Sequence, residues 1–115
     1  KSEEITRQWI IDELINRYGY PKELIDVEVK VNIETKAEKI DVVVYTYDNR
    51  DKVPFIFIKT NRLGEGTERA VIYLKEYMSN YDTVRYGIVT DGNELIIIND
   101  DLEEVDDIPC FRSVL

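Results

Sequence analysis

Two apolar runs in the middle of the chain determine the fold: Ile40-Asp-Val-Val-Val-Tyr45 and Phe55-Ile-Phe-Ile-Lys59. Short runs rich in β-branched and aromatic residues are typical of strands. The polar residues Asp48-Asn-Arg-Asp51 lie between them and favour a turn, so a hairpin is the simplest connection. Both runs are apolar enough for central strands of a sheet. Each also carries one charged residue, Asp41 or Lys59.

The flanking sequence predicts the other elements. A first helix is expected from Ser2, which can cap it, to about Tyr18, and a second from about Thr67 to Asn80. Ile5, Trp9, Ile10, Leu14 and Ile15 recur at helical spacing in the first. Strands are expected at 27–33, 39–47, 53–60, 85–90 and 94–99, and in the first of these Val27, Val29, Val31 and Ile33 share one face. The order α-β-β-β-α-β-β predicts an α/β fold, a mixed β-sheet flanked by helices.

Length and composition indicate one domain. The chain has 115 residues, of which 43% are hydrophobic and 34% charged, enough for a single core. We expect this domain to occupy residues 1–99. Residues 100–115 are expected to form an acidic tail or linker to a missing C-terminal region of a longer protein. No apolar run could span a membrane, and a cytoplasmic protein is expected.

The residues that are absent exclude several kinds of chemistry. The chain has no histidine, which excludes imidazole catalysis and the usual zinc sites, and its one cysteine, Cys110, cannot form an internal disulfide. The formal net charge is −9, and six acids lie within residues 100–107, which leaves 18 of the 24 acids against 15 cations in the rest of the chain. The body of the domain is therefore close to neutral. Tight binding of nucleic acid by this domain alone is not expected.

Asp41 and Lys59 point to phosphodiester chemistry. Metal-dependent hydrolysis of phosphodiesters uses carboxylates that hold divalent cations, with a nearby lysine to orient water and offset charge. Side chains alternate along a strand, so Phe57 faces the same way as Lys59 and occupies the position of a second acid. A local interpretation is also open, in which Asp41 caps a turn or pairs with Lys39 and the stem of Lys59 extends past Phe57.

The sequence around these residues resembles a known family, the N-terminal nuclease domain of type I restriction enzyme R subunits, within the PD-(D/E)xK superfamily. The resemblance covers nearly the whole chain and implies a restriction-endonuclease-like fold. It is carried by Glu4-x-x-Arg7-Gln8, Tyr18-Gly-Tyr-Pro-Lys-Glu-Leu-Ile25 leading into Glu28, Lys39-Ile-Asp-Val-Val-Val-Tyr45, Pro54-Phe-Ile-Phe-Ile-Lys59 and Tyr86-Gly-Ile-Val-Thr-Asp-Gly92.

The resemblance implies roles for particular residues. Asp41 would be the metal-binding aspartate, Lys59 the catalytic lysine, and Glu28 a further acid for catalysis and metal binding. Glu4, Arg7 and Tyr77 would be auxiliary. The second acid of the family falls at Phe57, and the Gln of its Gln-x-x-x-Tyr motif falls at Tyr73. The acids that could substitute are Glu28, Glu65, Glu68 and Glu76.

Two functional interpretations follow from the resemblance. In the first, the domain is a Mg²⁺-dependent endonuclease with an incomplete site, which acts on double-stranded DNA within a larger complex. Its partners there would be an ATP-dependent translocase region or modification and specificity subunits. In the second, the domain is a catalytically inactive pseudonuclease that serves as a DNA-contacting or protein-docking module. A second carboxylate close to Asp41 would favour the first interpretation, and a packed Phe57 would favour the second.

Overall fold

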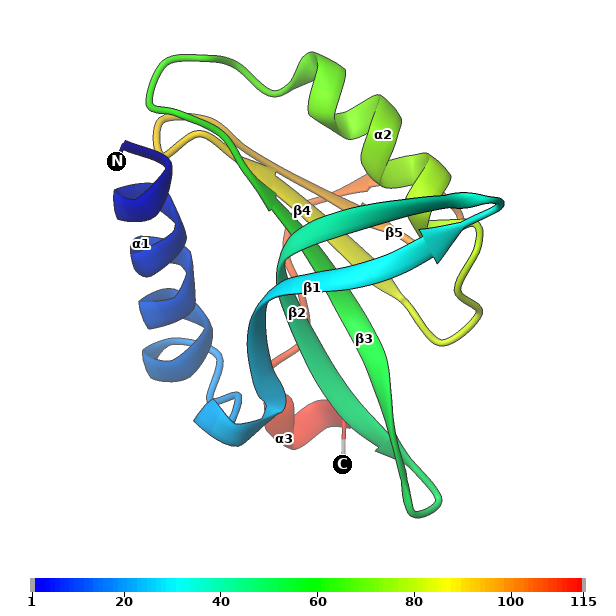
Figure 1. Ribbon diagram of the computed structural model, residues 1–115. Helices are drawn as coiled ribbons and strands as arrows, with labels where there is room; N and C mark the ends of the chain where they lie inside the picture. Colours follow the sequence, from blue (N-terminus) through cyan, green and yellow to red (C-terminus); the bar gives the residue numbers. More distant parts are fainter. Residues whose placement is uncertain (1, 115) are drawn as a thin grey trace.

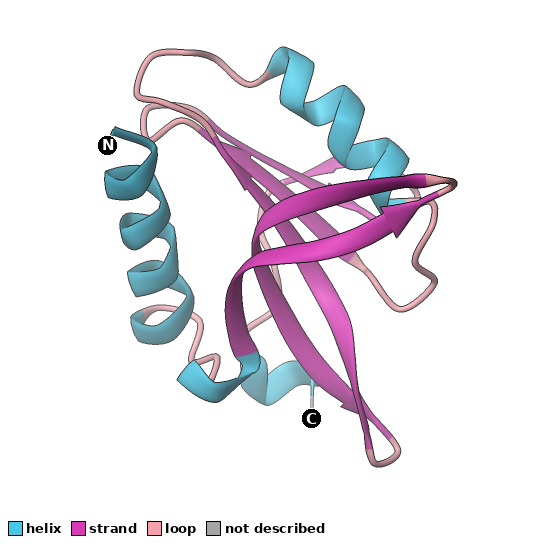
Figure 2. Ribbon diagram, in the orientation of Figure 1, coloured by secondary structure: helices cyan, strands magenta, loops and turns pink. Residues whose placement is uncertain are grey.

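The computed structural model describes residues 2–114 and shows one six-stranded sheet with helices on both faces (Figures 1 and 2). The side chain of Ser2, and with it the predicted helix cap, lies outside the described part. The helical segments are α1 (Ser2–Asn16), η1 (Lys22–Leu24), α2 (Glu68–Met78) and α3 (Phe111–Val114). The strands are β1 (Ile25–Ile33), β2 (Lys36–Asp48), β3 (Asp51–Thr60), β4 (Tyr86–Thr90), β5 (Leu95–Asn99) and β6 (Glu104–Val105).

The predicted α/β class and mixed sheet are confirmed. The strands lie in the order β1-β2-β3-β4-β5-β6, and only the β3–β4 pair is parallel. Because parallel strands need a crossover, α2 connects these two strands across one face of the sheet. The short elements η1, β6 and α3 add to the predicted set. None of the described helices is long and apolar enough to cross a membrane.

The sheet separates two apolar cores. Ile56 and Ile58 of β3 pack on the α1 side with Ile10 and Leu14, whereas Phe57 packs on the α2 side. This is the alternation expected of a strand buried on both faces. The two central apolar runs therefore form the middle of the sheet, as predicted.

The predicted apolar stripe of α1 is partly wrong. Thr6, Ile10 and Leu14 are buried, whereas Ile5 and Trp9 are 72% and 41% exposed. The buried residues are spaced four apart, and the two exposed residues each precede one of them by one position. One position on a helix is a rotation of about 100°. The stripe that faces the sheet is therefore turned away from Ile5 and Trp9.

The β1–β2 ribbon changes the face that it buries at Glu28, which has a φ of +53°. On one side of this point, the pair Ile25 and Val44 packs in the α1-side core. On the other side, the pair Val29 and Ile40 packs in the α2-side core. The tip of the hairpin consequently reaches over the end of α2 (Figure 1). Val27, predicted to be buried with Val29, is 45% exposed because it lies just before this twist.

The C-terminal segment returns to the domain. Strand β6 pairs with β5, and Ile108 is buried in the α1-side core. The Tyr20 hydroxyl donates a hydrogen bond to the carbonyl of Pro109 at 2.7 Å. Much of the acidic tail thus packs on the sheet. That it leads into a further region stays a prediction.

Candidate functional site

Three of the predicted site residues lie in one row across neighbouring strands. Glu28 lies opposite Asp41 along the strands, between the pairs Val27–Val42 and Val29–Ile40, although its side chain bonds to Arg7 of α1. Asp41 and Lys59 occupy the next opposed positions beyond the pair Val42–Ile58 of β2 and β3. Their charged groups lie 4.0 Å apart. The fold therefore brings Glu28, Asp41 and Lys59 into the same part of the sheet.

The carboxylate of Asp41 is bound within the sheet. Its Oδ2 accepts a hydrogen bond from the backbone N–H of Thr60 at 2.8 Å and lies 4.0 Å from Nζ of Lys59. The two side chains are 20% and 27% exposed. Asp41 thus holds the end of β3 and faces a cation. Among the described residues, no ion pair joins Asp41 to Lys39.

Phe57 fills the position where the resemblance places the second acid. Its side chain is fully buried in the α2-side core with Val43 and Leu74. Its ring packs edge to face against Tyr81, with 5.4 Å between the centroids. An acid at this position would lie among apolar side chains, where an unpaired carboxylate is strongly disfavoured. The position of the second acid is therefore part of the α2-side core.

Glu28 bonds to α1. Arg7 donates one hydrogen bond to Oε2 of Glu28 at 3.0 Å and two to the carboxylate of Glu4 at 2.7 and 2.8 Å. The hydrogen bond from Arg7 and the nearby charge of Lys39 lower the pKa of Glu28. The two acids likewise raise the pKa of Arg7. The structure therefore joins the predicted residues Glu4, Arg7 and Glu28 in one cluster, with the guanidinium as its cation.

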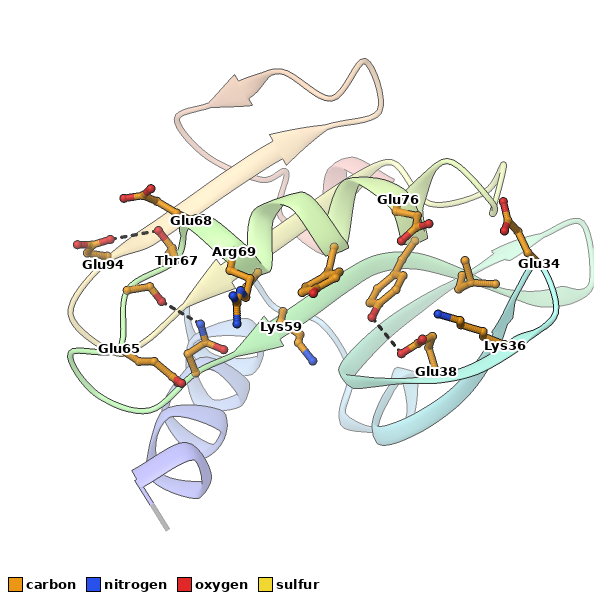
Figure 3. Close-up of a pocket in the computed structure, with 16 residues that line it drawn as sticks. Glu34, Lys36, Glu38, Lys59, Glu65, Thr67, Glu68, Arg69, Glu76 and Glu94 are labelled. Carbon is orange, nitrogen blue, oxygen red and sulfur yellow. Dashed lines mark hydrogen bonds between the residues drawn. The ribbon is translucent and has the colours of Figure 1, made fainter.

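Lys59 opens into a cleft of about 890 Å³ beside α2 (Figure 3). Loop 61–67 and the β1–β2 hairpin complete its walls. Tyr77 donates a hydrogen bond to Glu38 across the cleft at 3.2 Å, and burial together with this acid raises its pKa to about 12. Tyr73, at the position of the family glutamine, also lines the cleft and is 46% exposed. Tyr77 therefore connects α2 to β2 and does not bond to Asp41.

Acidic side chains dominate the cleft. Its carboxylates are those of Glu34, Glu38, Glu65, Glu68, Glu76 and Glu94, and its cations are Lys36, Lys59 and Arg69. The candidate substitute acids Glu65, Glu68 and Glu76 thus share the cleft with Lys59. Nowhere within residues 2–114 do three or more acidic, cysteine or histidine side chains form a group that could hold a metal ion.

Asp91 organises one wall of the cleft, and it was not among the site residues predicted from the sequence. It is 1% exposed. Its Oδ1 accepts the N–H groups of Asn93 at 2.9 Å and Glu94 at 2.7 Å, and its Oδ2 accepts the N–H of Gly66 at 2.9 Å. These N–H groups, that of Glu94 foremost, lower the pKa of Asp91. Its place just after a buried strand, before Gly92, was the available sequence signal.

The fold and the row of side chains define an α/β domain with an acid and a lysine facing each other on adjacent central strands. The family model described as the type I restriction enzyme R protein N terminus matches residues 2–109. This match covers most of the chain, which therefore belongs to that family, as the resemblance predicted. Among curated proteins, none matches the sequence.

Proposed function

We propose that this chain is a nuclease-fold domain of the restriction R protein type in which DNA cleavage is impaired or lost. Phe57 carries the proposal. It lies two positions before Lys59, on the strand that faces Asp41, and is fully buried. A site of this type needs a second carboxylate beside the lysine, and the core occupies that position.

The remaining acids do not fit a Mg²⁺ site. Mg²⁺ requires a nearly octahedral set of oxygen ligands and is usually held by one or two carboxylates. Here one oxygen of Asp41 accepts the N–H of Thr60, and Lys59 lies beside it. The carboxylate of Glu28 is paired with Arg7 at 3.0 Å. A divalent cation would have to displace both contacts, so we propose that the domain does not cut DNA. We propose further that it acts in a larger complex as a module that contacts double-stranded DNA.

One observation favours a second candidate function. Glu65 lines the same cleft as Lys59 and could act as a relocated acid in a weak Mg²⁺-dependent endonuclease. Its Oε1 accepts the N–H of Arg62 at 2.9 Å, which favours a role within its own loop. We therefore place this candidate second.

The test is nicking of supercoiled plasmid by the purified domain in Mg²⁺ or Mn²⁺. The variants are Asp41→Ala and Glu65→Gln, with Glu103→Gln as a surface control away from the cleft. We expect native protein and all variants to give the same background. Nicking by native protein that disappears in Asp41→Ala and persists in Glu103→Gln would overturn the proposal. Loss in Glu65→Gln as well would support the second candidate.

A further inference from the structure

We propose that Lys30 and Lys39, on the outer face of the β1–β2 hairpin, form a contact for the phosphate backbone of duplex DNA. The inference rests on the proposed function, because it names the surface by which this module would contact DNA. The two lysines are paired directly in the register of β1 and β2, and both are exposed.

Like charges directly opposite each other on neighbouring strands destabilise a sheet. Neither lysine has a salt-bridge partner among the described residues. Lys39 lies near the carboxylate of Glu28, but that carboxylate is paired with Arg7, so the repulsion between the lysines is compensated only in part. A phosphate group placed between the two ammonium groups would remove it.

The hairpin separates its charges by face. Val31, Ile33 and Ile40 point inward to the α2-side core, and Glu38 points inward to Tyr77. The outward positions next to the lysine pair are Asn32 and Ala37, which are also paired and exposed. This stretch of the outer face thus carries two cations, an amide and a small side chain, and no acid. The small side chain does not obstruct the approach of a polynucleotide backbone. The amide can also donate a hydrogen bond to a phosphate.

Neither Glu28 nor the acidic segment 100–107 neutralises the lysine pair. Glu28, two positions before Lys30, is already bonded to Arg7 at 3.0 Å. The acidic segment 100–107 lies at the other end of the sheet, because β1 and β6 are its opposite edges. Four or more strand spacings amount to roughly 20 Å. Charges separated by more than a Debye length of about 8 Å are largely screened at physiological salt.

The experiment is fluorescence anisotropy of a labelled DNA duplex titrated with the domain over a range of salt concentrations. The variant Lys30→Gln/Lys39→Gln is compared with Lys22→Gln/Lys75→Gln, which removes the same charge from η1 and α2. A third variant, Lys30→Arg/Lys39→Arg, keeps the charge of the pair. Circular dichroism confirms that each variant is folded.

We expect the hairpin variant to lose at least tenfold in affinity at low salt. The slope of log K against log salt should fall by about two, since each phosphate contact contributes about 0.9. The control and the arginine variant should remain close to native protein. Equal losses in the hairpin and control variants, or unchanged binding by the hairpin variant, would overturn the inference and leave the proposed DNA contact standing. No duplex binding by native protein would overturn both. A domain that nicks plasmid would contradict only the proposed loss of cleavage.

Discussion

At the scale of single residues, Phe57 and Asp91 show when a buried position can hold an acid. Phe57 occupies the position of a missing acid, and its ring packs with Tyr81 in the core. Asp91 is an acid that the structure keeps buried, because three backbone N–H groups bind its carboxylate. A buried carboxylate is stable where it accepts several hydrogen bonds and is disfavoured where it has none. The same principle explains both residues.

We predict that Asp91→Asn lowers stability at neutral pH. The amide oxygen can still accept the N–H groups of Asn93 and Glu94, but the amide nitrogen would face the N–H of Gly66, and two donors repel. The lowered pKa of Asp91 adds a pH dependence. The carboxylate contributes stability above the ordinary aspartate pKa of about 3.9. This contribution is lost as the pH falls through the lowered value.

The measurement is the free energy of unfolding in urea from neutral pH to below pH 4. The difference between native protein and Asp91→Asn should narrow as the pH falls. Asp82→Asn, at an exposed position, is the matched control and should follow native protein throughout. A constant difference between native protein and Asp91→Asn across this range would contradict the assigned role.

At the scale of elements, the contact between α2 and β4 depends on a residue without a side chain. A Cβ at Gly87 would lie 2.5 Å from Sδ of Met78 and 2.8 Å from Cδ2 of Leu74. The helix therefore approaches the sheet more closely than any larger residue would allow. This approach also fixes α2 as a wall of the cleft.

We predict that Gly87→Ala destabilises the domain by about 1–3 kcal/mol, the usual cost of overpacking a core. Chemical denaturation measures the effect. Met78→Ala removes the nearest obstacle, so the double variant should lose less stability than the sum of the two single variants. Additive losses would show that the two positions do not compete for space.

The strands and helices were predictable because their apolar periodicity is strong and because turn residues separate them. The facing positions of Asp41 and Lys59 did not follow from the hairpin alone, because a register shift between Val44 and Tyr45 moves Asp41 from the position opposite Ile58 to the position opposite Lys59. The direction of Glu28 was not predictable either, because a positive φ at a glutamate has no sequence signal comparable to that of glycine. The exposed position of Val27 depends on the same twist. The hydrogen bonds of Asp91 to Gly66 join residues far apart in sequence, and only the folded chain brings them together.

At the scale of the whole molecule, the acidic and basic side chains are concentrated in different parts of the domain. Six acids of segment 100–107 lie at the β6 edge, acids dominate the cleft, and the paired lysines lie near the opposite edge. Such a charge distribution would let polyanions approach at the lysine pair and would repel them from the acidic regions. This asymmetry suits a module that contacts DNA in a larger assembly, as proposed for this member of the R protein N-terminal family.

The central claim is that the site beside Phe57 does not bind a divalent metal. The most direct test is a titration of the domain with Mn²⁺ that is monitored by electron paramagnetic resonance. It tests the row of Glu28, Asp41 and Lys59 without requiring any partner that cleavage might need. We predict no saturable binding at millimolar Mn²⁺ and no difference between native protein and Asp41→Asn. A saturable site in native protein that is lost in both Asp41→Asn and Glu28→Gln would contradict the account, because the row would then hold a metal despite Phe57.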